Sequence, residues 1–86
     1  EGVSLSVDNN KNKFKFFPNP AKNEINIRLS SNLNYIKLFD ISGKLILYKK
    51  FNSNNIRLNV SPFSRGTYVL SIENDLGIVN KKLIIR

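Results

Sequence analysis

Apolar residues occupy every second position in several short segments of this chain. Residues 25–29, 56–60 and 68–72 show this spacing. Successive side chains of a β-strand point to opposite faces, so a period of two is typical of a strand with one buried face. Asn, Ser, Gly and Pro separate the segments, and no segment has helical apolar spacing over three turns. The pattern predicts an all-β domain in which about seven strands form two antiparallel sheets packed face to face.

Residues 35–50 are predicted to form the central hairpin of this fold. Asp40 suits the first position of a type I turn because its carboxylate can accept the backbone N–H two residues on, and Gly43 suits the fourth, left-handed position. With that register two faces are expected: Ile36, Leu38, Ile46 and Tyr48 on one, and Tyr35, Phe39, Leu45 and Leu47 on the other. We expect the first face to be core and the second to be an unusually apolar surface.

The 86 residues are long enough for one small domain with a single core. Residues 14–86 are assigned to the sandwich. Residues 1–13 are assigned to an upstream linker or the end of a preceding domain, with residues 3–7 either a short strand or part of that domain. The chain has no initiator Met, no signal peptide pattern and no apolar run long enough to cross a membrane, so we expect a piece of a longer protein without membrane insertion.

The chain is strongly basic, with 14 Lys and Arg against 6 acidic residues and a net charge of +8. Such a charge favours anionic partners, including nucleic acid, acidic polysaccharide and lipopolysaccharide. The cations are scattered along the whole chain without forming a block. This distribution favours a solvated basic surface, and we expect no nucleic-acid partner.

Residues that commonly carry catalysis are scarce. His and Cys are absent, which removes the most frequent general base, the best nucleophile and the strongest transition-metal ligands. The acids after Glu24 are only Asp40, Glu73 and Asp75, and they are dispersed in the sequence. We therefore expect a protein that is not an enzyme, with no catalytic residues, no metal and no cofactor.

Two segments near the ends of residues 14–86 are unusual for strands. Pro18-Asn19-Pro20 removes two ladder donors and must stop the strand that begins at Phe14, either as an edge terminator or as a feature that a partner recognises. The segment 78–86 has no single period. Val79, Lys81, Leu83 and Ile85 share one side, and Lys82 and Ile84 share the other, so we expect a β-bulge near Lys81.

Four motifs follow one another in a familiar order. They are Phe17-Pro18-Asn19-Pro20-Ala21, Ile36-Lys37-Leu38-Phe39-Asp40-Ile41-Ser42-Gly43-Lys44, Gly66-Thr67-Tyr68-Val69-Leu70-Ser71-Ile72 and Lys81-Lys82-Leu83-Ile84-Ile85. Through them the region from Phe14 to Arg86 resembles the type A C-terminal sorting domain of proteins exported by the type IX secretion system. Phe17 and Phe39 stand where that family more often has tyrosine. The resemblance implies an immunoglobulin-like antiparallel β-sandwich.

The resemblance also implies a function. The domain would be the removable sorting signal of a larger secreted protein of Bacteroidota-type bacteria, with the cargo N-terminal on the same chain. The outer-membrane translocon and its shuttle protein would recognise the domain, and in many members a sortase-like peptidase removes it. The implied location is the cell surface or the medium, reached through the periplasm and the outer membrane.

The candidate recognition residues come from the four motifs. They are Pro18, Asn19, Pro20, Phe39, Asp40, Gly43, Lys44, Gly66, Tyr68, Lys81, Lys82, Leu83, Ile84 and Ile85. One hypothesis is docking through an open edge of the strand at residues 83–85, with Lys81 and Lys82 steering an acidic receptor. The alternative is that this strand is simply part of the sheet. Another candidate docking surface is the apolar patch of Phe39, Leu45 and Leu47.

A carbohydrate-binding or adhesin module is the rival interpretation, because such modules are also small β-sandwiches of secreted enzymes. It requires a row of solvent-facing aromatic rings. The candidate rings are Tyr35 and Phe39.

Overall fold

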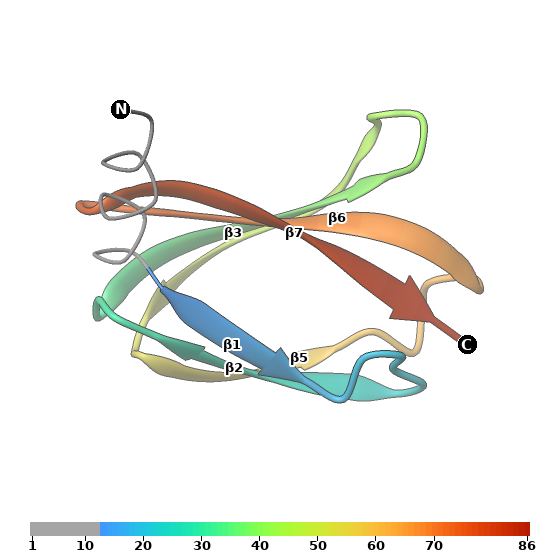
Figure 1. Cartoon of the computed structure of the whole chain (residues 1–86), viewed down its shortest axis with the longest axis horizontal. Coiled ribbons are helices and arrows are strands. Elements are labelled where there is room, and N and C mark those ends of the chain that lie inside the picture. Colours follow the sequence, from blue (N-terminus) through green and yellow to red (C-terminus); the bar gives the residue numbers. More distant parts are fainter. Residues whose placement is uncertain (1–12) are drawn as a thin grey trace, which may run out of the picture.

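The computed structural model describes residues 13–86, which form two antiparallel β-sheets packed face to face. The strands are β1 (Phe14–Phe17), β2 (Glu24–Leu29), β3 (Leu33–Asp40), β4 (Leu45–Asn52), β5 (Asn55–Asn59), β6 (Gly66–Asn74) and β7 (Gly77–Ile85). One sheet has the order β1-β2-β5 and the other β4-β3-β6-β7, seen as the lower and upper layers of Figure 1. The predicted immunoglobulin-like antiparallel sandwich is confirmed. The proposed strand at residues 3–7 lies outside the described residues.

The core lies between the two sheets and uses the alternate residues that the period of two predicted. Its largest completely buried aliphatic side chains are Ile25, Ile27, Ile36, Leu38, Val60, Leu70, Ile72 and Leu83. Burial of one such side chain contributes about 1.5–3 kcal/mol. Within residues 13–86, no helix is long and apolar enough to cross a membrane.

The turn at Asp40 has the predicted geometry. The Gly43 N–H donates to the Asp40 carbonyl at 3.0 Å, and Gly43 has a φ of +92°. One oxygen of the Asp40 carboxylate accepts from the Ser42 hydroxyl at 2.6 Å and from the backbone N–H groups of Ser42 and Lys44, each at 2.9 Å. The Ser42 hydroxyl and then the Lys44 N–H lower the pKa of this carboxyl below its ordinary value of 3.8. The Asp40 carboxylate therefore stabilises the turn.

The predicted faces of the hairpin are wrong from Leu47 onward, whereas Leu45 lies outside beside Phe39 and Ile46 packs against the core, as predicted. Leu38 pairs with Leu47 and Phe39 with Leu45, which leaves Ile46 as the extra residue of a β-bulge. A one-residue slip exchanges the two faces of a strand, so Leu47 packs against the core and Tyr48 lies on the outer face. There the Tyr48 ring lies parallel to the Tyr35 ring, with 6.3 Å between centroids. The outer apolar patch thus loses Leu47.

The predicted bulge near Lys81 is also wrong. β6 and β7 pair without interruption from Gly66 and Ile85 to Asn74 and Gly77. Lys81 keeps its place on the core side of β7, and its ammonium leaves the core at the sheet edge. The Lys81 Nζ donates to the Phe14 carbonyl of β1 at 3.2 Å and lies 5.1 Å from the centre of the Phe14 ring. An edge strand tolerates a core-side Lys because the long side chain can reach solvent.

Asn34 is a polar residue buried inside the sandwich. It belongs to β3 and is completely buried. Its Nδ2 donates to the carbonyls of Ser31 at 2.6 Å and Ser53 at 2.9 Å, and its Oδ1 accepts from Asn74 Nδ2 at 2.9 Å. This one carboxamide therefore connects three chain reversals at the same end of the sandwich.

Candidate functional site

The chain changes sheets at Pro18-Asn19-Pro20. Before it, Phe17 pairs with Asn26 of β2 in the three-stranded sheet. After it, Ala21 forms a parallel bridge with Ile85 of β7 in the four-stranded sheet. Proline has no N–H to donate to a ladder, so two prolines mark the place where the backbone leaves one sheet and joins the other.

The side chain of Asn19 bonds to β7 at this crossing. Its Nδ2 donates to the Lys82 carbonyl at 3.2 Å, and its Oδ1 accepts from the Ile84 N–H at 3.0 Å. A carboxamide offers the same donor and acceptor as a peptide group. Asn19 thus supplies, from its side chain, the strand pairing that its proline neighbours cannot supply from their backbone.

Ala21 continues the pairing along β7. Its N–H donates to the Ile84 carbonyl at 2.8 Å, and its carbonyl accepts from the Arg86 N–H at 2.7 Å. We call residues 19–21 bound to residues 82–86 the clip. The hypothesis of an open edge at Leu83–Ile85 is wrong, because the clip covers this edge, and the alternative of a strand held within the fold is correct. Neither Ala21 nor Arg86 was among the candidate residues, although Ala21 directly follows the Pro-Asn-Pro motif.

Register partners connect the clip to the other motifs. Asp40 pairs with Tyr68 of β6, and Tyr68 pairs with Leu83 of β7, whose neighbours Lys82 and Ile84 bind Asn19. Gly66 pairs with Ile85. The right-hand end of Figure 1 contains four segments: the turn of Asp40–Lys44, the start of β6, the crossing and the end of β7. We call this the signature end; β1 begins at the opposite end.

The remaining candidate residues have separate places. Tyr68 is buried, and its hydroxyl donates to the Ser64 carbonyl at 2.6 Å, as in the tyrosine corner of immunoglobulin-like sandwiches. Its ring packs on Phe63, so Tyr68 is structural. Phe39 faces outward on β3 beside Leu45, and Lys81, the residue directly before the clip on β7, contacts β1.

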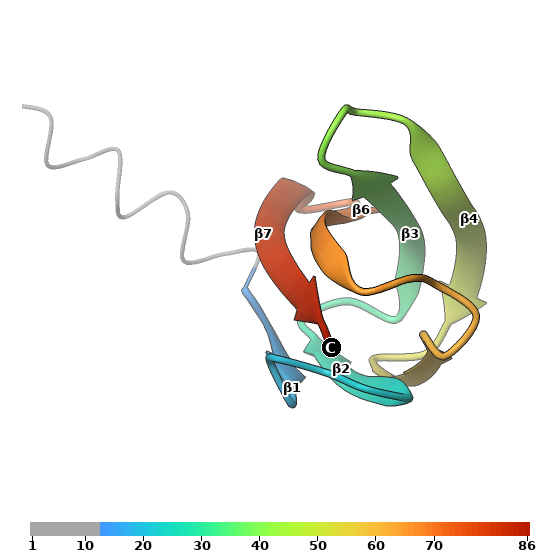
Figure 2. The same ribbon diagram turned by 90° about the vertical axis from the view of Figure 1, so that its right-hand side faces the viewer.

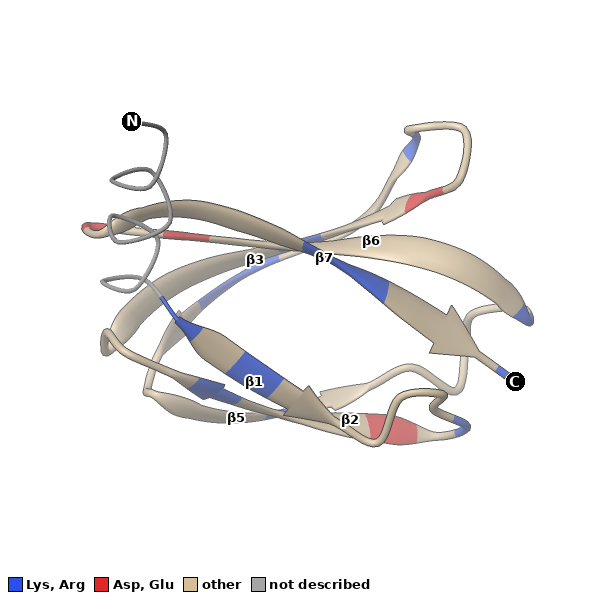
Figure 3. Cartoon of the chain, in the orientation of Figure 1, with Lys and Arg blue, Asp and Glu red and all other residues tan. Residues whose placement is uncertain are grey.

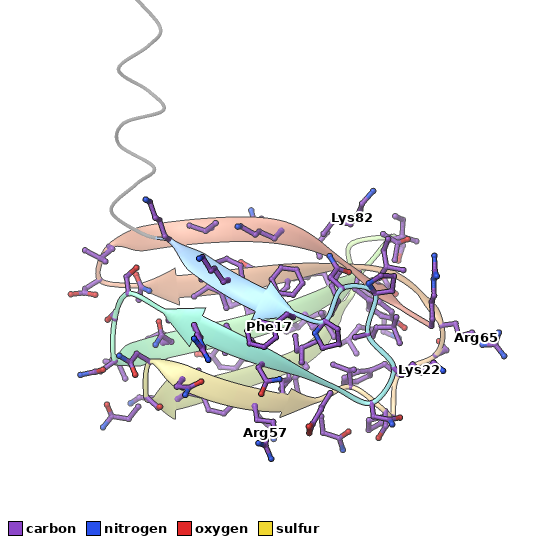
Figure 4. The ribbon with its side chains drawn as sticks, turned by 60° about the horizontal axis from the view of Figure 1, so that its bottom comes forward. Phe17, Lys22, Arg57, Arg65 and Lys82 are labelled. Carbon is purple, nitrogen blue, oxygen red and sulfur yellow. The ribbon has the colours of Figure 1, made fainter. Side chains whose placement is uncertain are left out.

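The surface of the signature end is mixed in character. Ile41 at the tip of the hairpin is 79% exposed. Phe17 at the end of β1 is half exposed and carries the Arg28 guanidinium 5.6 Å from its ring centre. Figure 4 shows Phe17 beside the crossing, with Lys82 pointing to solvent from β7 and Arg57 from β5. The described residues contain no cluster of three or more potential metal ligands.

Comparison with known protein families identifies the family of this chain. A family model for the secretion system C-terminal sorting domain matches residues 15–86. The chain belongs to this family. The sorting domain is thus a type IX C-terminal sorting signal, which implies export to the cell surface or the medium.

A solved structure shares the fold of the sorting domain. It is PorZ, an essential bacterial surface component of the type-IX secretion system of Porphyromonas gingivalis, with a TM-score of 0.66 and 11% sequence identity. The match covers 98% of this chain and 12% of PorZ. At this identity the likeness concerns the fold alone. No curated protein matches the chain.

Proposed function

We propose that the sorting domain is a non-catalytic export signal that the type IX translocon and its shuttle protein read at the signature end. The cargo precedes the domain on the same chain, and the domain directs it across the outer membrane. The recognised object is a folded surface, because the motifs meet only in the folded domain. In this proposal a sortase-like peptidase would cut in the region that joins cargo and sandwich.

The hydrogen bonds of Asn19 to β7 are the observation that carries this proposal. They join residues that are 63 and 65 positions apart in the sequence. The Asp40–Tyr68–Leu83 row then brings the other motifs to the same end. A set of motifs that is dispersed in sequence and contiguous in the fold is what a receptor for the folded domain requires.

The position where β1 begins fits such a signal. It lies at the end of the sandwich opposite the signature end (Figure 1). A cargo domain attached before Lys13 would leave the signature end free to contact the secretion machinery.

A reporter fusion tests the proposal. Residues 1–86 are attached behind a periplasmic reporter in a host that has the type IX translocon and in a host that lacks it. We expect the reporter outside the cell in the first host only. Retention in the periplasm of both hosts, with the fused domain folded and protease-resistant, would rule out the proposal.

Two matched variants locate the recognised end. Ile41→Ser changes an exposed side chain at the signature end, and Leu76→Ser changes an exposed side chain at the opposite end, in the β6–β7 turn. Ile41→Ser should lower export several-fold, while Leu76→Ser should leave it unchanged. Equal effects of the two variants would contradict recognition at the signature end.

A carbohydrate-binding module remains the second candidate because of one observation. Tyr35 and Tyr48 lie parallel on the outer face of the four-stranded sheet, as in a platform for a sugar ring. The ammonium groups of Lys50 and Lys37, however, lie 5.9 Å and 5.7 Å from the centres of these two rings and compete for their faces. Retention of the domain on insoluble polysaccharide, abolished by Tyr48→Ala, would favour this function.

A further inference from the structure

The edges of β1 and β7 lie on the same side of the sandwich and leave a hollow between them. Figure 2 shows β1 below β7 on the side opposite β4. The hollow has a volume of about 570 Å³ and is lined by Lys13, Phe14, Lys15, Ile78, Val79, Asn80 and Lys81. On β7 it ends at Lys81, directly before the clip begins at Lys82.

The charge of this hollow is one-sided. Three of its lining residues are Lys, and none is acidic. Figure 3 shows the blue positions of Lys and Arg along β1 and β7, with the nearest red positions near the β6–β7 turn. The Lys81 ammonium has three donors, of which the Phe14 carbonyl takes one. A carboxylate entering the hollow would therefore find both a positive potential and a free donor.

The backbone of β7 is open along the same hollow. In an antiparallel ladder the peptide groups that point away from the paired strand recur at every second residue. On β7 this row contains Lys82, Ile84 and Arg86, which the clip covers, and before them Ile78 and Asn80. Within residues 13–86, β7 is the edge of its sheet and no strand pairs with Ile78 and Asn80 on this side. An added strand can use such an edge.

From these observations we infer that the hollow binds an extended, acidic segment of a partner polypeptide. The partner's backbone pairs with β7 at Ile78 and Asn80, and its carboxylates contact Lys81, Lys13 and Lys15. The open backbone row favours a polypeptide over an acidic sugar, and the absence of acidic lining residues favours an acidic segment over a basic one. The inference goes beyond the proposed function and does not require it.

A peptide titration tests the inference on residues 1–86. The probe is a fluorescent ten-residue peptide of alternating Glu and Val, and binding is measured by anisotropy. The comparison peptides are one of alternating Lys and Val and one in which N-methylated residues keep the Glu charges but remove ladder donors. We expect binding of the first peptide alone, with slowed hydrogen exchange at the Ile78 and Asn80 amides. Equal binding of the N-methylated peptide, or slowed exchange along β4 instead, would overturn the inference.

Lys81→Met removes the ammonium and keeps an unbranched side chain against Phe14, so the fold should persist. The matched control is Lys22→Met, an exposed position in the loop after the crossing, with the same fall in net charge from +8 to +7. Loss of a hydrogen bond between charged groups should weaken peptide binding about tenfold in Lys81→Met and less than twofold in Lys22→Met. Lys15→Glu provides a second variant outside the core and should also weaken binding. Unchanged binding in both hollow variants would overturn the inference.

Two further measurements distinguish peptide binding from self-association and from export. Concentration-dependent dimerisation in sedimentation experiments, lost in Lys81→Met, would place a second copy of this chain in the hollow and overturn the inference. In the export assay, failure of the unmodified fusion contradicts the proposed function and leaves the peptide result standing. Normal export together with absent peptide binding contradicts only the inference.

Discussion

Single side-chain carboxamides replace backbone pairing at two places in this domain. Asn19 does so at an exposed sheet edge, and Asn34 does so in the interior. Neither role was predictable from the sequence, because Asn is common in turns and no local pattern distinguishes a buried Asn from an exposed one. By contrast, the roles of Asp40 and Gly43 were predictable, since five consecutive residues, Asp40–Lys44, contain the groups that stabilise the turn.

Asn34→Ala should lower the free energy of unfolding by about 1–3 kcal/mol, because the half-buried Ser31 and Ser53 carbonyls and the Asn74 amide would lose their partner. Urea unfolding followed by circular dichroism measures the change. Asn32→Ala, at an exposed position of the adjacent loop, is the control and should stay within about 0.5 kcal/mol of the unmodified domain. Equal stability of the two variants would show that the Asn34 network contributes nothing.

The Asp40 turn makes stability depend on pH at the acidic end. The folded pKa of Asp40 is lower than its ordinary value of 3.8, so the carboxylate stabilises the fold above that value. This contribution is lost as the pH falls through the folded pKa. Unfolding measured from pH 6 to pH 2 should therefore show a smaller loss of stability in Asp40→Asn than in the unmodified domain.

The Ser42 hydroxyl is the main cause of that shift, so Ser42→Ala should move the pKa of Asp40 toward 3.8. Carbon NMR titration of the carboxyl group measures the pKa directly. Ser61→Ala removes an equivalent hydroxyl from the uncharged Asn59 turn and should leave the Asp40 pKa unchanged. An unaltered pKa in Ser42→Ala would refute the assigned cause.

At the scale of elements, local patterns predicted which strands exist but could not predict how the edge strands are completed. The alternation in residues 25–29 and 68–72 marked β2 and β6 because each has one buried face. The Ile46 bulge exchanged the faces of β4 from Leu47 onward, and no local feature of Leu45-Ile46-Leu47 distinguishes a bulge from regular pairing. The clip was also missed, because its two halves lie at opposite ends of the described chain.

Asn19→Ala tests the clip as an element. The change removes two hydrogen bonds to β7 at an exposed edge, where water can replace part of the loss. We expect the free energy of unfolding to fall by about 1–2 kcal/mol and the Ile84 amide to exchange faster with solvent. Asn19→Asp keeps the acceptor for the Ile84 N–H and loses the donor to Lys82, so its effect should be smaller. If Asn19→Ala changes neither quantity, the carboxamide does not hold β7.

At the scale of the whole molecule, the family motifs contain the residues that hold one end of the fold together. Two-layer architecture followed from the period of two, and the scattered charges were compatible with a solvated surface. Neither the period of two nor the charge distribution predicted that the four motifs would meet at one end. That arrangement depends on strand order and on a crossing between sheets. Strand order is fixed by contacts between distant segments, which one sequence does not display.

Because the last motif is also part of the fold, deletion of residues 82–86 should have a predictable effect on folding. Leu83 and Ile85 are buried in the core, and residues 82–86 complete the clip. Two buried aliphatic side chains contribute about 3–6 kcal/mol. That loss approaches the total stability of a small domain, about 5–15 kcal/mol, before the lost strand pairing is counted. We therefore expect the truncated chain to lose its β-sheet circular dichroism spectrum and its cooperative thermal transition. A truncated chain that retains both would show that β7 is dispensable for folding, and loss of export on truncation could then be assigned to recognition of the strand itself.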